Sequence, residues 1–150
     1  MARLDLSFLG TFHATLDSRP LTHFRSNNNR GLLVYLALNG ERPVGREVLA
    51  ALFWPDESSD TAYNNLRQAL YQLRQLLGDA ADADAPYLTT TRQSVQFNCA
   101  SDHTLDVTRF LRAIEAGDLD AAVAHYTGEL LPGFTCDSLE FETWLRLERE

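Results

Sequence analysis

Residues 61–78 read TAYNNLRQALYQLRQLLG, and the fold can be predicted outward from this stretch. No proline interrupts it, Gly78 supplies a usual helix end, and Ser58, Ser59 and Asp60 offer helix caps just before it. At about 100° per residue, its core-type side chains fall within an arc of about 100°. These side chains are Leu66, Ala69, Leu70, Leu73 and Leu77. The stretch therefore predicts an amphipathic helix over residues 61–77 with a buried apolar stripe.

The other side of this predicted helix is polar and free of acidic residues. Its side chains are arginines, amides and a tyrosine: Asn64, Arg67, Gln68, Tyr71, Gln72, Arg74 and Gln75. A helix fits the major groove of DNA, where arginine pairs with guanine, and asparagine or glutamine with adenine. A merely solvated helix face is the alternative, but such faces usually carry Glu–Lys pairs at four-residue spacing, which this one lacks. The face therefore has the side-chain chemistry of a DNA-reading helix.

Shorter patterns on either side of this helix complete the order of elements. The predicted elements are strands at 4–8 and 12–16, helices at 30–38 and 46–53, and a hairpin of strands 87–91 and 94–97. Asn27, Asn28 or Asn29 is the predicted cap of the first helix. A polar linker rich in Asp and Ala spans residues 79–86. Three helices, the last two joined by a short turn, and a following hairpin predict an α+β winged helix-turn-helix.

The remaining candidate DNA contacts lie at the hairpin tip and near the starts of the first two helices. Thr90, Thr91 and Arg92 occupy the tip, from which they are expected to reach phosphate or an adjacent minor groove. Arg25, Arg30 and Arg46 are expected to contact backbone phosphates, with a solvated surface arginine as the equally simple interpretation of each.

Charge divides the chain into two parts. The whole chain has a formal net charge of −8, and all of its basic residues other than histidine are arginines. Residues 1–98 carry nine arginines against ten acidic residues, whereas residues 99–150 carry four against eleven. Such an acidic chain is unsuited to non-specific nucleic-acid binding, which depends on neutralising phosphates. The acidic balance does not exclude a local arginine-rich face in residues 1–98.

The second part has a helical pattern. Helices are predicted at 106–116, 119–125 and 139–150. The last pattern reaches Glu150 without a stop signal, so a truncated domain is expected. The predicted domains are thus a winged-helix DNA-binding domain over residues 1–100 and the beginning of an all-α domain over residues 101–150.

Several functions are disfavoured by what the sequence lacks. It contains no GxGxxG, P-loop, HExxH or GxSxG motif, and its four histidines are isolated, so an enzyme, a cofactor and a bound metal ion are not expected. Cys99 and Cys136 are too few and too scattered for a disulfide framework or a metal site, and reduced thiols are expected. No apolar run approaches the roughly 18 residues of a membrane span, and the N-terminus lacks a signal peptide's apolar core. A cytoplasmic protein without membrane contact is expected.

Residues 61–78 resemble the recognition helix of SARP-type bacterial transcriptional activators, whose DNA-binding domain is a variant of the OmpR-like winged helix. The matching positions are Ala62, Asn64, Leu66, Leu73, Arg74 and Gly78. Upstream, LSFLG at residues 6–10 resembles the family's first strand, and LAALFWP at residues 49–55 resembles its second helix. The family's recognition helix often carries more arginine, and Gln72 and Gln75 stand here at positions that are commonly basic.

The part after the hairpin resembles the beginning of the bacterial transcriptional activator domain, a bundle of TPR-like helices. Its most specific segments are GELLPGF at residues 128–134 and WLRLER at residues 144–149. The family's activator domain is normally longer than this part of the chain. The resemblance extends over nearly the whole sequence.

The resemblance implies a transcription activator that binds direct repeats near promoters and contacts RNA polymerase. The helix at 61–77 would lie in the major groove of double-stranded DNA, and the wing at 88–97 would contact the DNA beside it. A homodimer on DNA is left open. The alternative from a different class is a protein-docking module that uses the winged-helix and TPR-like surfaces without binding DNA.

Overall fold

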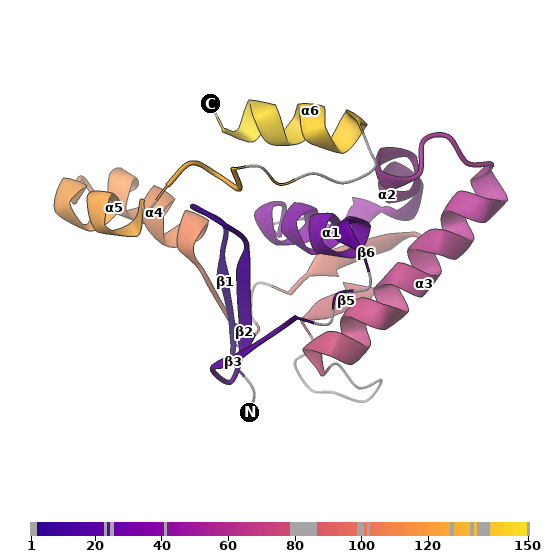
Figure 1. The fold of residues 1–150 in the computed structure, drawn as a ribbon, viewed down its shortest axis with the longest axis horizontal. Helices are drawn as coiled ribbons and strands as arrows, with labels where there is room; N and C mark the ends of the chain where they lie inside the picture. Colours follow the sequence, from indigo (N-terminus) through magenta and orange to yellow (C-terminus); the bar gives the residue numbers. More distant parts are fainter. Residues whose placement is uncertain are drawn as a thin grey trace. The chain divides into compact units, whose positions relative to one another are not determined.

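The structure, a computed structural model, divides into two compact units, each assembled from separate stretches of the chain (Figure 1). Unit 1 contains residues 1–21, 102–134 and 148–150, and unit 2 contains residues 22–101 and 135–147. The structure describes residues 3–22, 24, 26–40, 42–78, 87–98, 101, 103–126, 128–132, 134 and 139–149. The predicted linker at 79–86 and the residues Arg25, Cys99 and Cys136 lie outside the described residues.

Unit 2 contains the predicted winged helix. Its elements are α1 (Asn27–Leu38), β4 (Val44–Gly45), α2 (Arg46–Phe53), α3 (Ser59–Leu77), β5 (Leu88–Thr90), β6 (Ser94–Phe97) and, from much later in the chain, α6 (Leu139–Glu148). The strands form an antiparallel sheet in the order β4-β6-β5, with Val44 opposite Val95 and Leu88 opposite Phe97. The predicted α+β fold is confirmed, and α2 begins and ends at the predicted residues.

Helix α3 buries the predicted stripe. Leu66, Ala69, Leu70, Leu73 and Leu77 are all buried, as is Ala62 one turn earlier. The Ser58 side chain caps the helix by accepting a hydrogen bond from the backbone N–H of Thr61. Gly78 ends it in the left-handed conformation, φ 75°, which a residue without a Cβ adopts at little cost.

Helix α1 begins earlier than predicted. Ser26, and not one of the three following asparagines, is its cap, because its extended backbone lets the hydroxyl accept the N–H of Asn29 at 3.2 Å. The predicted asparagine cap was therefore wrong. Asn29 lies within the first turn, where only 3% of its surface is exposed.

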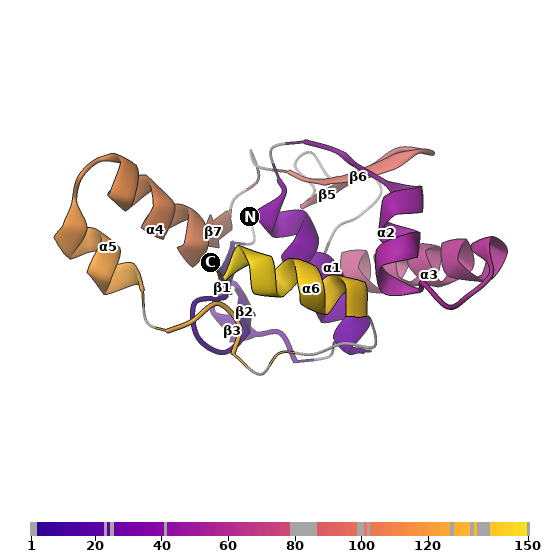
Figure 2. The same ribbon diagram turned by 90° about the horizontal axis from the view of Figure 1, so that it is seen from above.

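Helix α6 belongs to the core of unit 2. It lies over α1 in both views (Figures 1 and 2), with Phe141 and Leu145 buried and the Trp144 ring 4.7 Å from that of Tyr35. Gly31 in α1 permits this approach, because a Cβ there would lie 3.0 Å from the Phe53 ring and 3.4 Å from the Phe141 ring. The compact units therefore do not follow the predicted boundary at residue 100. The division into domains 1–100 and 101–150 stays a prediction.

Unit 1 combines a four-stranded sheet with a helical hairpin. Its elements are β1 (Leu4–Ser7), β2 (His13–Leu16), β3 (Arg19–Pro20), β7 (His103–Leu105), α4 (Asp106–Glu115) and α5 (Leu119–His125). The strand order is β3-β2-β1-β7, and β7 pairs in parallel with β1, which places Leu4 opposite His103. The sequence did not predict β7, because three residues are too short to show an alternating pattern.

The start of α4 is fixed to the end of β1 through Asp106. Its carboxylate accepts backbone N–H groups of Phe8 and Leu9 at 2.9 and 2.8 Å, and also that of Val107. Beside it, Leu130 forms β-bridges with Leu9 and Gly10. Two of the segments that carry the family resemblance, residues 6–10 and 128–134, are thus hydrogen-bonded neighbours.

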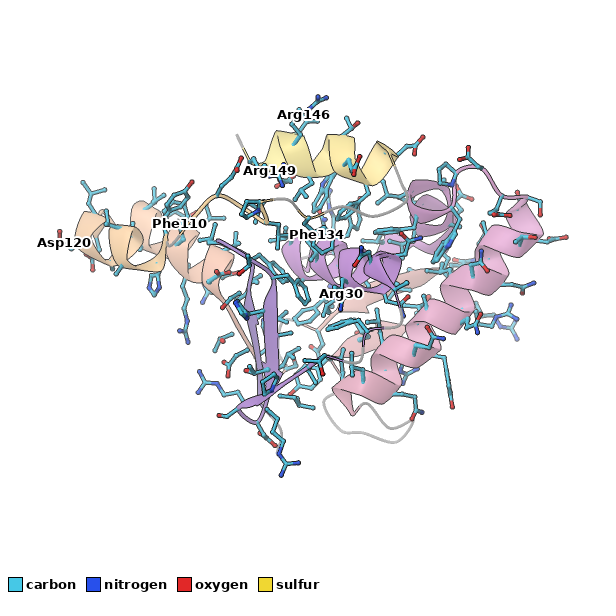
Figure 3. The ribbon with its side chains drawn as sticks, in the orientation of Figure 1. Arg30, Phe110, Asp120, Phe134, Arg146 and Arg149 are labelled. Carbon is cyan, nitrogen blue, oxygen red and sulfur yellow. The ribbon has the colours of Figure 1, made fainter. Side chains whose placement is uncertain are left out.

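Arg149, the last described residue, contacts the segment that contains Leu130 and Leu131. Arg149 donates hydrogen bonds from Nε and Nη2 to the carbonyl oxygens of Leu130 and Leu131 (Figure 3). Phe134 packs near Phe12, with ring centroids 6.1 Å apart. The bend at residues 130–134 is therefore held by backbone pairing on one side and by a guanidinium on the other.

We expect Phe141→Ala to lower the free energy of unfolding by about 3–5 kcal/mol, because it removes a fully buried ring from the contact between α6 and α1. Urea denaturation followed by circular dichroism would measure it. The matched control is Arg146→Ala on the same helix, whose exposed side chain points away from the ribbon (Figure 3) and whose loss should change stability by no more than about 0.5 kcal/mol. Equal stability of the two variants would contradict the packing of α6 described above.

Candidate nucleic-acid interface

The centre of the predicted DNA-reading face is exposed. Asn64, Arg67, Gln68 and Tyr71 all point to solvent from α3, and 65% of the Tyr71 surface is accessible. Within the described residues, none of these four side chains forms a hydrogen bond or an ion pair with another part of the protein. Their donors and acceptors are therefore available to a ligand.

The two edges of this face are partly buried, although the helical period groups their side chains with the exposed ones. On one edge, Gln72 accepts a hydrogen bond at its Oε1 from Asn29 Nδ2, at 2.9 Å. On the other edge, Arg74 is half-buried, and its Nε is buried without a hydrogen-bond partner among the described residues. Gln72 thus contributes to the packing of α3 on α1, whereas Arg74 retains an unused donor.

A hollow of about 290 Å³ lies along the Arg74 edge. Its walls come from the start of α2, from α3 and from β5, and the lining residues are Arg46, Arg67, Leu70, Tyr71, Arg74, Gln75 and Thr90. Burial lowers the pKa of Arg46, and the positive charge of Arg67 lowers it further. Four of the predicted site residues, the three arginines and Tyr71, therefore meet in one place.

The wing is shaped by side chains that were predicted to contact DNA. The Thr91 hydroxyl accepts the backbone N–H groups of Gln93 and Ser94, at 3.2 and 2.9 Å, and so closes the turn. Arg46 donates from Nε to the Thr91 carbonyl and from its backbone N–H to the Gln93 carbonyl, both at 2.9 Å. Arg92, at the tip, is exposed. Thr91 is exposed as well, but its hydroxyl is used within the turn, whereas the Arg92 side chain forms no hydrogen bond with a described residue.

Arg30 lies in the first turn of α1, apart from this cluster. Its guanidinium stands 5.1 Å from the centre of the Phe24 ring and donates from Nη1 to Asn27 Oδ1 (Figure 3). It lines neither the hollow above nor the second one beside α3, of about 260 Å³, which contains Phe24, Asn29 and Gln72 among its walls. The structure therefore brings Arg46, Arg67 and Arg74 together and leaves Arg30 separate.

The described part of the chain has neither a candidate metal site nor a candidate membrane span. No group of three or more His, Cys, Asp or Glu side chains there could hold a metal ion. None of the helices described has the length and apolar character needed to cross a membrane.

We expect Gln72→Ala to lower the free energy of unfolding by about 1–3 kcal/mol, because it leaves the buried Asn29 amide without its acceptor. Thermal or urea unfolding would measure it. Gln68→Ala, four residues earlier on the exposed side of α3, is the matched control and should stay within about 0.5 kcal/mol of the parent. A Gln72→Ala variant as stable as this control would show that the Asn29–Gln72 hydrogen bond does not contribute.

Comparison with known proteins shows which proteins this chain is similar to. Residues 24–94 match the family described as "Transcriptional regulatory protein, C terminal". The transcriptional regulatory proteins EmbR of Mycobacterium bovis and Mycobacterium tuberculosis are each 28% identical to this chain over 124 residues. Those alignments cover 83% of this chain and 31% of the relatives, so the chain spans about a third of their length.

A solved structure extends the similarity to the fold. It is Mycobacterium tuberculosis EmbR in complex with a low-affinity phosphopeptide, which matches with a TM-score of 0.74 and 25% sequence identity. The match covers 99% of this chain and 42% of that one. The predicted resemblance to SARP-type regulators is thereby confirmed. Residues 24–94 are an OmpR-like winged-helix domain of the kind found in transcriptional regulatory proteins, and the chain is a homologue of EmbR, a regulator of the SARP family.

Proposed function

We propose that this chain is the DNA-binding part of a transcription regulator, with α3 in the major groove of double-stranded DNA. The observation that supports this most directly is the exposed, acid-free face of α3 on a winged helix of a regulator family. A helix-turn-helix reads bases through its second, recognition helix, which crosses the major groove. Because the four central side chains have no partner among the described residues, they are available for base edges.

Each exposed side chain has a base or backbone group that suits it. Arg67 can donate two hydrogen bonds to guanine, while Asn64 and Gln68 can each pair with adenine. Tyr71 can pack against the backbone or donate its hydroxyl to a phosphate. Arg92 at the wing tip contacts phosphate or the adjacent minor groove in this proposal, and Thr91 supports the wing's turn.

The edge residues and Arg30 have supporting parts in the same proposal. Gln72 holds α3 against α1 and offers its remaining amide donors to DNA. Arg74 and Arg46 grip DNA beside the wing, and Arg30 contacts the backbone near the start of α1. The wing at residues 88–97 lies on the DNA next to the groove that α3 enters.

The finer features of the proposal come from the family resemblance. They are activation rather than repression, direct repeats near promoters as the target, contact with RNA polymerase, and assembly as a homodimer on DNA. The relatives are named transcriptional regulatory proteins, and no catalytic activity is proposed. Because the relatives are bacterial proteins and bacterial DNA lies in the cytoplasm, the proposal includes a cytoplasmic location.

We expect selection from a random pool of DNA duplexes to enrich one sequence motif, and the enrichment to weaken at the higher of two salt concentrations. The Arg67→Ala, Arg74→Ala double variant should lose the enrichment, since one base contact contributes about 1–3 kcal/mol of discrimination. Arg109→Ala, Arg112→Ala is the matched control: it removes the same charge from exposed positions of α4 and should keep the motif.

Two results would contradict the proposal. Absence of any enriched motif from a chain shown to be folded would favour the alternative function, a protein-docking module that binds no DNA. Equal loss of enrichment in both double variants would mean that net charge, and not the α3 face, determines binding.

A further inference from the structure

The hollow along the Arg74 edge carries positive charge and has no acidic side chain among its described lining residues. Three of these residues are arginines from two helices. The ion pairs found in the described part of the chain involve other arginines, Arg3 and Arg149. The mutual repulsion of Arg46 and Arg67 is one of the causes that lower the pKa of Arg46. A negative group bound in the hollow would offset this repulsion.

Arg74 supplies the second indication of a ligand. Its Nε is buried without a hydrogen-bond partner among the described residues. A buried donor without an acceptor is costly, and such groups in native structures usually have an explanation such as a missing ion. The Thr90 hydroxyl, in the same wall, also forms no hydrogen bond with a described residue. Both groups would be satisfied by an anion with several acceptor oxygens.

We infer that this hollow is a binding site for one phosphate group, held by Arg74, Arg46 and the Thr90 hydroxyl. Guanidinium groups bind phosphate through parallel, charge-assisted hydrogen bonds, which suit Arg74 and the terminal nitrogens of Arg46. Arg46 already uses its Nε to hold the Thr91 carbonyl, so the site lies where the wing is attached to α2. In the DNA complex, and resting on the proposed function, the ligand is one backbone phosphate between α3 and the wing.

Arg74 and Arg67 have different roles at this site. A side chain that is half-buried in a hollow and bound to phosphate fixes the position of the protein on DNA and does not read a base. Arg67, which is exposed at the rim of the hollow, keeps the base-reading part. The two arginines therefore differ in what their loss should do to sequence preference.

The first experiment tests the hollow without DNA. Inorganic phosphate is titrated into the chain while the side-chain N–H signals of its arginines are followed by ¹H–¹⁵N NMR. We expect saturable shifts of the Arg74 Nε–H signal, identified by its disappearance in Arg74→Ala, and the same shifts in the control Arg112→Ala. Absence of a saturable shift would overturn the site as a phosphate site.

The second experiment tests the DNA phosphate as the source. Each phosphate of the selected duplex is replaced in turn by a neutral methylphosphonate, and dissociation constants are measured for the parent and for Arg74→Ala. We expect one position at which replacement weakens binding by the parent about tenfold, the size of one charge-assisted hydrogen bond, and has no further effect on Arg74→Ala. Thr90→Val, which removes one hydroxyl at similar volume, should show partial coupling at the same position and serves if Arg74→Ala does not fold.

Comparing the affinities for the selected duplex and for an unrelated duplex tests the role of Arg74 independently. Arg74→Ala should weaken binding to the selected and to an unrelated duplex by the same factor and reduce the salt slope by about one. Asn64→Ala should weaken binding to the selected duplex alone. Loss of affinity confined to the selected duplex in Arg74→Ala would make this arginine a base reader and overturn the inference.

The two experiments distinguish a free phosphate compound from a DNA backbone phosphate as the ligand. They also distinguish failure of the phosphate site from failure of the proposed function. Shifts with inorganic phosphate but no coupled position in the duplex would assign the site to a free phosphate compound and overturn the backbone contact. If the parent binds no duplex, the proposed function fails, and the titration with inorganic phosphate alone decides whether the hollow binds phosphate.

Discussion

The buried stripe of α3 is the constraint on which the winged-helix unit depends. Leu66, Leu70, Leu73 and Leu77 must all face the core, and the helical period then leaves Asn64, Arg67, Gln68 and Tyr71 on the outside. Packing fixes the direction of the exposed face without using any of its side chains. The residues that contact a ligand can therefore differ while the fold stays the same, because the energy that orients α3 comes from the opposite side of the helix.

How much of the fold and of the candidate site the sequence predicts depends on how far apart in the chain the interacting residues are. The bounds of α2 and the buried side of α3 follow from local signals, namely periodicity, caps and Gly78, and these predictions were confirmed. Strand β7 and the packing of α6 on α1 depend on contacts between residues about 100 positions apart, such as Leu4 with His103 and Gly31 with Phe141, which no local pattern reports. In the candidate site, the sequence predicted which side chains share a face of α3. It could not predict that Gln72 is bound to Asn29, or that Arg46 holds the wing.

The proposed DNA-binding face is physically consistent with an acidic chain. Its net charge of −8 repels DNA at long range, but at physiological ionic strength charges farther than about 8 Å apart are largely screened. What DNA meets at contact distance is the local charge, and α3 carries Arg67 and Arg74 with its acidic residue, Asp60, confined to the first turn. An acidic residue in the first turn also interacts favourably with the helix dipole. In the proposed complex, non-specific attraction to DNA is therefore weak while the specific contacts remain favourable. This combination raises the ratio of specific to non-specific affinity.

In the proposed DNA complex, burial and not residue type separates base reading by Arg67 from phosphate binding by Arg74. Arg67 and Arg74 have the same side chain on the same face, but Arg67 is exposed, whereas Arg74 lies half-buried in the hollow with Arg46 and Thr90. A guanidinium that is already partly desolvated loses less hydration when it meets a phosphate. An exposed guanidinium such as that of Arg67 loses more hydration on binding. Hydrogen bonds compensate for this loss only where the base offers matching acceptors, which is the condition for discrimination. The wing, held at Arg46, then fixes the distance between the gripping site and the reading residues, so a change at Arg46 would disturb both.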